Sequence, residues 1–569
     1  MSHRPNLRRT LVLLAGLALS GPTARAGFNN PFGLQLRPPP KTMAEIRAPV
    51  IVREAPTNEA SMVERSDGAV EVYFITKPAS DSVSCLRSED GGLTWSEPRL
   101  AFTLPGKAYY AVQALEAADG SLQAVYHLLG EGPGGYRGRL YEVYHTQCRP
   151  GETTWSPPRK VVPGYVGSIR GFTQLQSGRL VLAVAQAVPE RLQPPPSGPD
   201  LGWHDTRVFT SDDLGGSWRE SPDRLQVTLH SPNATRYGAI EPVLLEMRDK
   251  RVWMLVRDRQ GRLWQSYSED GALRWPPLER TRFISSDSPA ELLRLRDGRI
   301  LLLLNACQNW TNPRSYAMGG REVLQAALSD DEGHSWRGFR EVLHETQELT
   351  RGDRGAAYAS AVQNREGKLV VVSGQGEGKR AIFLLDPAWL EETRQGDDLS
   401  SGPVGWTQYG GQGLSLREQD GTPALSFPVA ADRGNGASWN FPLGAAGTLT
   451  WRMRVPVGAG QVTVSLNDHF TRVDDRRANG EAVFSMAWPE TTTEQWSQVR
   501  LTWSGADGAA GEATLSVDGT VVKRSTVQRA AEWGVNYLRL DVSATTAGGT
   551  IGIAGAAAEV VPAKSDSRK

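Results

Sequence analysis

The clearest pattern in this sequence is an alternation of apolar and polar residues that turns back on itself six times. Each copy reads as an alternating strand, a tight turn and an apolar return strand, which is typical of a β-hairpin. Six such hairpins, one per blade, predict a six-bladed β-propeller within an all-β chain. The six turns are Asp67-Gly68, Asp119-Gly120, Ser177-Gly178, Asp249-Lys250, Asp297-Gly298 and Glu366-Gly367.

A second repeat, with the template S-x-D-x-G-x-x-W, runs out of phase with the hairpins. Its tryptophans, with Trp155 from a decayed copy, recur at about 60 residues, the size of a four-stranded blade. Asp can accept bonds from turn amides, Gly permits a positive φ and Trp packs into the blade, so we interpret the box as structural. Its carboxylates are too few at liganding spacing to predict a metal. The copies span Ser88–Trp95, Ser211–Trp218, Ser268–Trp275 (with Ala272 in place of Gly) and Ser329–Trp336.

The last blade has no such box, and the apolar run Pro49-Val-Ile-Val52 precedes the first hairpin. We therefore expect this N-terminal strand to complete the last blade and close the ring, which removes exposed strand edges. The propeller is predicted over residues 48–390.

A different pattern of strands follows a polar, Gly- and Ser-containing stretch over 391–405, which reads as a linker. Alternating runs at Thr448–Val455, Trp496–Trp503 and Thr514–Val522, the last with an Asp518-Gly519 turn, predict a β-sandwich over 406–562. Residues 563–569 read as a tail. We expect an accessory module without catalytic residues.

Three tryptophans and three aspartates of this sandwich are candidates for sugar binding and calcium binding, respectively. Trp451, Trp488 and Trp503 lie in or beside alternating strands, where core packing is the more frequent role and sugar stacking the alternative. The acidic set Asp468, Asp474 and Asp475 lacks the spacing of a calcium site, so no metal is predicted.

The N-terminus reads as a signal peptide over residues 1–26, followed by a lead-in over 27–47. Arg4, Arg8 and Arg9 form a basic region, an apolar core follows, and Ala24-Arg25-Ala26 is a small-x-small cleavage site. Arg8-Arg9 leaves both the general and the twin-arginine export routes open. We expect a secreted or periplasmic protein with no membrane span, because no later apolar run is long enough.

Charge and cysteine content narrow the function classes. Lys plus Arg and Asp plus Glu both number 63, so no strong field favours nucleic acid or an anionic membrane. Cys85, Cys148 and Cys307 cannot make a disulfide framework and lie in or beside strand-like runs, so we expect buried free thiols. Nothing in the sequence indicates a cofactor.

Candidate chemistry emerges when the six hairpins are aligned on their turns, because innermost strands begin at the mouth of a propeller's channel. Glu59, Glu241 and Tyr358 occupy the same place, eight residues before their turns, and Arg257 returns beside Glu241 across its hairpin. Arg170 lies one place from the equivalent position. Strand starts are normally apolar, so this convergence is a candidate site.

The four boxes on a six-bladed repeat resemble the sialidase superfamily over about residues 48–390. The resemblance implies a Tyr nucleophile activated by Glu, an Asp acid/base and three Arg that hold the substrate carboxylate. It assigns Tyr358 as nucleophile, Glu241 as its partner, Asp81 as the acid/base, and Arg257 and Arg321 as two of the arginines. The C-terminal region is similar to laminin-G or concanavalin-like domains through Trp496-x-Val-x-Leu-x-Trp and the Val517-Asp-Gly hairpin.

The chain departs from the family at the start of blade one, where Asn58-Glu59-Ala60 stands in place of an Arg-Ile-Pro motif and Arg53 is the nearest arginine. We expect Glu59 to replace the missing arginine, bonding a sugar hydroxyl or pairing with a neighbour such as Arg53. Three classes of function stay open: an exo-acting hydrolase of sialic acid or a related acidic sugar, another carbohydrate-active enzyme such as a polysaccharide lyase, and a non-catalytic glycan-binding propeller. In each, the expected partner is a carbohydrate, with Arg257, Arg321, Glu59 and Arg170 as its contacts.

Overall fold

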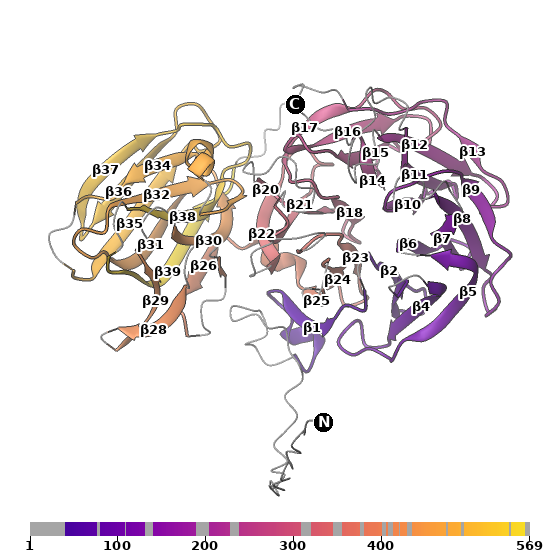
Figure 1. The fold of residues 1–569 in the computed structure, drawn as a ribbon, viewed down its shortest axis with the longest axis horizontal. Coiled ribbons are helices and arrows are strands. Elements are labelled where there is room, and N and C mark those ends of the chain that lie inside the picture. Colours follow the sequence, from indigo (N-terminus) through magenta and orange to yellow (C-terminus); the bar gives the residue numbers. More distant parts are fainter. Residues whose placement is uncertain are drawn as a thin grey trace, which may run out of the picture.

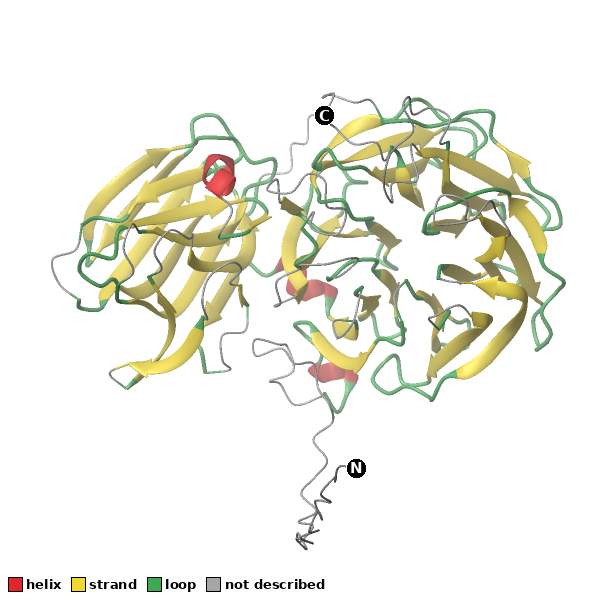
Figure 2. Cartoon of the chain, in the orientation of Figure 1, coloured by secondary structure: helices red, strands yellow, loops and turns green. Residues whose placement is uncertain are grey.

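A computed structural model of the chain describes most residues between 40 and 563, and strands with their loops make up nearly all of it (Figure 2). Among these residues no helix has the length and apolarity of a membrane span. The predicted signal peptide and most of the lead-in and tail lie outside the described residues. So do the segments at 58, 77–79, 109, 131–139, 189–203, 228–237, 309–319, 345–354, 376–379, 401–404, 408–413, 420, 430–434, 474–475, 491–493 and 545–547.

The described part of the first two thirds of the chain forms six four-stranded antiparallel sheets, one per predicted hairpin. Each begins with the hairpin that the alternation predicts and adds two outer strands. The sheets are, in order, β2 (Ser61–Glu64), β3 (Val70–Phe74), β4 (Ser80–Ser88) and β5 (Arg99–Ala108); β6 (Val112–Glu116), β7 (Leu122–Gly130), β8 (Leu140–Cys148) and β9 (Arg159–Val162); β10 (Gly171–Gln174), β11 (Leu180–Ala187), β12 (His204–Ser211) and β13 (Arg219–Glu220); β14 (Ile240–Glu246), β15 (Val252–Arg257), β16 (Arg262–Ser268) and β17 (Glu279–Ile284); β18 (Glu291–Arg294), β19 (Ile300–Leu304), β21 (Val323–Ser329) and β22 (Arg337–His344); and β23 (Ser360–Gln363), β24 (Leu369–Ser373), β25 (Ala381–Leu385) and β1 (Val50–Glu54).

The six sheets form a closed ring. The innermost strands touch in the order β2, β6, β10, β14, β18, β23 and back to β2, and their labels surround the centre of the ring in Figure 1. Strand β1 pairs with β25 through the register Val50↔Leu384, so the N-terminal strand completes the last blade. The prediction of a six-bladed propeller closed by this strand is confirmed.

The four S-x-D-x-G-x-x-W boxes are structural turns, as predicted. In the second copy the Asp213 carboxylate accepts bonds from Ser211 Oγ at 2.8 Å and from the Ser217 amide at 2.8 Å, while the Gly215 amide donates to Ser211 Oγ at 2.7 Å. The Ser217 amide bond holds the pKa of Asp213 below its usual range. The same bonds recur around Asp90, Asp270 and Asp331.

Antiparallel order separates these boxes from the candidate site. Innermost strands begin at the channel mouth, second strands end there, and third strands begin there and run to the opposite end, where the boxes lie. The boxes and the aligned polar residues therefore occupy opposite ends of the blades, as predicted.

The rest of the chain forms a β-sandwich of two antiparallel sheets, as predicted. Its core holds Trp451, Trp488 and Trp503, all buried, so their predicted core role is confirmed. One sheet contains β28 (Ser415–Gln419), β29 (Thr422–Pro428), β39 (Thr550–Val561), β31 (Ala446–Arg454), β35 (Ser497–Ser504), β36 (Glu512–Val517) and β37 (Thr520–Thr526), with β26 (Arg394–Asp397) also on β39; the other contains β27 (Trp406–Thr407), β30 (Asn435–Gly444), β38 (Val535–Ser543), β32 (Gln461–Asn467) and β34 (Phe484–Ala487). Short 3₁₀ turns lie at η2 (Met43–Glu45), η5 (Pro387–Glu391) and η6 (Arg476–Glu481).

The segments expected to connect the domains are more ordered than their composition suggests. Within the expected linker, β26 pairs with β39, so these residues belong to the sandwich. At the other end, Ile46 of the expected lead-in is buried in the core between the first and last blades. Short polar segments gain strand structure here because a neighbouring sheet edge offers them backbone partners.

The sandwich is docked firmly on blade five. Strand β20 (Cys307–Gln308) leaves that blade and pairs in parallel with β33 (Phe470–Thr471) of the sandwich. Cys307 and Phe470 are buried together with Tyr537, whose hydroxyl donates to Glu341 at 2.6 Å and accepts from Gln325 at 2.7 Å. A buried interface strand pair and the hydrogen-bonded Tyr537 hydroxyl hold the two domains together.

All three cysteines are buried free thiols, as predicted. Burial raises the pKa of Cys85 to about 12, which removes the thiolate needed for nucleophilic chemistry. The thiols therefore serve packing.

We expect Asp213→Ala to lower the free energy of unfolding by about 1 kcal/mol, because several turn donors exchange the carboxylate for water. Asp212→Ala, next to it in sequence and paired with Arg179 on the surface, should change it by less than about 0.5 kcal/mol. Since the folded pKa of Asp213 is depressed, its stabilisation is present above the unfolded value of 3.8 and is lost as the pH falls through the folded value. Urea unfolding at neutral and acidic pH measures both effects; equal losses in the two variants would contradict the structural role of the box.

We expect Tyr537→Phe to weaken domain docking by about 1 to 3 kcal/mol, because Glu341 and Gln325 lose a buried partner. Tyr267→Phe, which removes only a long bond to Gln265, is the matched control. Thermal unfolding should separate into two transitions, or begin at a lower temperature, in the first variant only. An unchanged profile would mean that the hydroxyl network does not hold the domains together.

Candidate active site

Four of the six residues aligned at the starts of the innermost strands have left-handed backbone. The φ values are 57° at Glu59, 59° at Ala111, 50° at Glu241 and 58° at Tyr358. This conformation costs a residue other than glycine about 1 to 2 kcal/mol. At Glu241 the strand pairing is also irregular between Ile240 and Val243, where Pro242 donates no ladder bond. The repeat thus carries a kink at the same place in four blades.

The kinks of blades four and six bring Tyr358 and Glu241 together. The Tyr358 hydroxyl donates to Glu241 Oε1 at 2.8 Å, and both side chains are buried. Arg257 Nε lies 3.0 Å from Glu241 Oε2, so the carboxylate is held on both oxygens. Burial raises the pKa of Glu241 despite the opposing effect of Arg257. A carboxylate of raised pKa bonded to a phenol is suited to take the phenolic proton.

Two guanidinium groups lie near the Tyr358 ring. The guanidinium carbon of Arg257 is 6.0 Å from the ring centroid and that of Arg321 is 5.3 Å. Both arginines donate to the backbone carbonyl of Asp287, at 2.7 Å and 2.8 Å. One carbonyl therefore holds both groups in place, and the four predicted residues Tyr358, Glu241, Arg257 and Arg321 form one cluster.

Glu59 enters the same network from blade one. Its carboxylate accepts from Ser168 Oγ at 2.5 Å and from Gln375 Nε2 at 3.5 Å. The amide oxygen of Gln375 accepts from Arg321. Glu59 is thus linked to the cluster through Gln375, while Arg53 donates to Ser96 O instead, so the suggested pair with Arg53 is wrong.

Arg170 crosses the channel rather than joining this cluster. It is buried, bonds Glu291 Oε2 at 3.0 Å on blade five and donates to Ala359 O on blade six. Its described contacts therefore brace the strand that follows Tyr358.

Asp81 pairs with a lysine of its own blade. It lies near the start of β4, at the channel-mouth end of blade one, where its exposed carboxylate accepts from Lys107 Nζ at 2.7 Å. That bond holds the pKa of Asp81 below its usual range. An acid catalyst needs the opposite shift, so this pairing has to break before Asp81 can donate a proton.

The alignment of the six hairpins did not identify Asp287, Gln375 and Ser168, which connect the predicted residues. Each lies within two residues of a position eight places from a hairpin turn: Pro289 and Ile169 precede the turns at Asp297 and Ser177, and Gly374 follows the turn at Glu366. Asp287 is buried, and its carboxylate bonds Arg259 Nε at 2.9 Å. Polar residues one or two places before or after each aligned position include all three. Within the described part of the chain no three or more His, Cys, Asp or Glu gather as metal ligands would.

The BNR repeat-like domain family matches residues 83–371 of this chain. Among solved structures, a protein of unknown function from Dyadobacter fermentans is similar at 17% identity and a TM-score of 0.43, over 60% of this chain and 97% of that one. A Trypanosoma rangeli sialidase in complex with sialic acid is 13% identical with a TM-score of 0.37, over 91% and 92%. An alpha-L-arabinofuranosidase from Fusarium graminearum is 12% identical with a TM-score of 0.42, over 61% and 100%. None of the curated proteins matches the chain.

We expect Ala111→Gly to leave the protein more stable than Ala114→Gly by about 1 to 2 kcal/mol. Both changes remove one buried methyl group from blade two, but only Ala111 has a positive φ that glycine relieves. Chemical unfolding of the two variants measures the difference. Equal losses would mean that the left-handed kink stores no strain.

Proposed function

This chain belongs to the BNR repeat-like domain family, and on that premise we propose that it is a sialidase-like exo-glycoside hydrolase acting on sialic acid or a related acidic sugar. The observation that carries the proposal is the buried bond from the Tyr358 hydroxyl to Glu241 beside two guanidinium groups. Sialidases are the known exception among glycosidases in using a Tyr nucleophile.

The proposed reaction begins at that bond. Glu241 accepts the phenolic proton while the Tyr358 oxygen bonds to the anomeric carbon, and the glycosidic carbon–oxygen bond breaks as the leaving oxygen takes a proton from an acid. Water then displaces the tyrosine oxygen and gives up a proton to the conjugate base of that acid, which restores the acid. Glu241 returns its own proton to the tyrosine oxygen. A tyrosine is neutral before it reacts, so it does not repel an anionic sugar.

Arg257 and Arg321 are the proposed ligands of the sugar carboxylate, since guanidinium groups bind carboxylates through paired, charge-assisted bonds. Glu59 takes the place of a third arginine in this proposal and is suited to accept a bond from a sugar hydroxyl. Arg170 contributes by holding the strand beside Tyr358. Asp81, at the same end of its blade, remains the proposed acid once a substrate displaces Lys107.

We expect Tyr358→Phe to lower kcat/KM on a chromogenic aryl sialoside by about a thousandfold or more, because the nucleophile is lost. Glu241→Gln should lower it by about 10² to 10⁴-fold through loss of the base. Tyr126→Phe changes another buried tyrosine of the propeller and should leave turnover intact. Turnover that survives in Tyr358→Phe would refute the assignment, and an unsaturated product from acidic polysaccharides would identify a lyase.

Glu241 must be ionised to act as a base, and its pKa is raised above the usual 4.5. We therefore expect kcat/KM to fall as the pH is lowered through this raised value, with the acidic limb above pH 4.5. The limb should disappear in Glu241→Gln. A limb at or below pH 4.5 would mean that Glu241 is not the group that titrates.

A further inference from the structure

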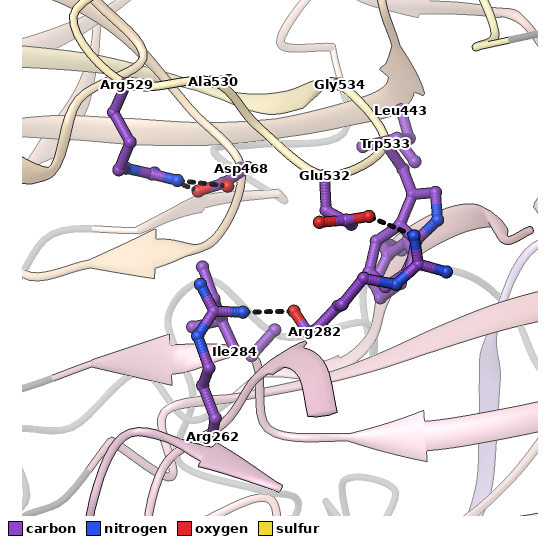
Figure 3. A pocket seen from close by; sticks show the side chains of 12 residues that line it. Arg262, Arg282, Ile284, Leu443, Asp468, Arg529, Ala530, Glu532, Trp533 and Gly534 are labelled. Atoms are coloured by element: carbon purple, nitrogen blue, oxygen red, sulfur yellow. Dashed lines mark hydrogen bonds and ion pairs between the residues drawn. The ribbon is translucent and has the colours of Figure 1, made fainter. Parts of the chain in front are cut away.

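A pocket lies where the sandwich meets the outer strands of blade four, at the end of the blade that carries the candidate active site (Figure 3). The propeller side contributes Arg262 at the start of β16 and Arg282 and Ile284 at the end of β17. The sandwich side contributes Asp468 and the segment 529–534, which includes Trp533. The pocket holds about 60 Å³, room for an anionic group such as a carboxylate or sulfate.

Two of the three arginines in this pocket already have carboxylate partners. Arg529 binds Asp468 through two bonds of 2.8 Å and 2.6 Å. Arg282 pairs with Glu532, and its guanidinium carbon lies 5.4 Å from the Trp533 ring centroid. These pairs are drawn as dashed lines in Figure 3.

Arg262 is the exception. It is half-buried, and its guanidinium donates to the backbone carbonyl of Arg282 with no carboxylate in ion-pair contact among the described residues. Burial and the neighbouring Arg280 lower the pKa of Arg262, with Arg529 adding to the effect. Asp468 and Glu532 oppose this lowering. The pocket lining carries three arginines against two carboxylates, and Arg262 is the arginine that a bidentate anion would match.

The pocket is connected to the active site by a short loop. Ile284 lines the pocket, and three residues later Asp287 holds Arg257 and Arg321 through its carbonyl. The Ser285 amide donates to Gly261 O at 3.1 Å, which ties the start of this loop to the residue before Arg262. A glycan bound at the channel mouth thus has a second cationic site on the same face of the propeller.

We propose that this interdomain pocket is a second binding site for an acidic glycan, in which Arg262 binds the carboxylate or sulfate of a sugar unit away from the reacting one. The proposal rests on the proposed function for the identity of the ligand as a glycan. It makes the sandwich part of substrate binding, because Asp468, Arg529 and Trp533 form one wall of the site.

The test is binding of a galacturonic acid hexamer to the full-length protein, measured by calorimetry at low salt in a Tyr358→Phe background that prevents turnover. We expect Arg262→Gln to weaken binding about tenfold or more. Arg280→Gln is the matched control: it removes the same charge from an exposed arginine that lies outside the pocket lining and donates to Gln260 O. It should weaken binding no more than about twofold. Equal losses in the two variants would overturn the proposal, as would strong binding of a neutral maltohexaose.

Glu532→Gln provides a test that does not depend on the folding of the Arg262 variant, because Glu532 is exposed. Removing this negative charge should tighten binding of the acidic hexamer about threefold. Unchanged affinity would contradict an anion site here. If inorganic sulfate at equal ionic strength displaces the hexamer fully, the pocket is a site for free anions and not for a glycan.

Turnover of a monomeric aryl glycoside separates this proposal from the proposed function. Arg262→Gln should leave kcat/KM on the monomer unchanged and raise KM for an acidic oligosaccharide. If no glycoside is cleaved at all, the proposed function fails, yet the hexamer titration still decides the second site.

Discussion

The antiparallel pairing of β1 with β25 is the contact on which the rest of the propeller depends. It completes the last blade with a strand from the opposite end of the domain, so the two ends of the propeller are held together by an antiparallel strand pair. The last blade carries Tyr358, whereas Glu241 stands two blades earlier. Ring closure therefore fixes the distance between the two groups that the proposed chemistry needs.

Ring closure alone would leave strand starts with regular backbone at the channel mouth. The left-handed residues at these strand starts change the direction of their side chains. A left-handed residue directs its side chain away from the direction that a regular strand would give it. Tyr358 and Glu241 meet because each sits on such a residue, and Arg257 and Arg321 converge because they share the carbonyl of Asp287. Strain in the backbone is offset by a network in which each charged group has a protein partner.

Much of this arrangement could be read from the sequence because a repeat makes equivalent positions comparable. Hairpin turns and the box template gave the number of blades, and counting eight residues back from each turn found Glu59, Glu241 and Tyr358. The contact of Arg170 with Glu291 across the channel could not be predicted in this way. A repeat identifies equivalent residues in different blades, but it does not identify which residues face each other across the ring. The docking of β20 on β33 was missed for a similar reason: two-residue strands carry no alternation to detect.

The central claim is that Tyr358 is the group that reacts with the sugar. A 2,3-difluoro derivative of sialic acid, whose fluorines slow hydrolysis of a covalent intermediate, tests it most directly when followed by mass spectrometry of the intact protein and its peptides. We predict the gain of one sugar per chain, located on the peptide that contains Tyr358, and no gain in Tyr358→Phe. A label on any other residue, or a label that persists in Tyr358→Phe, would contradict the account.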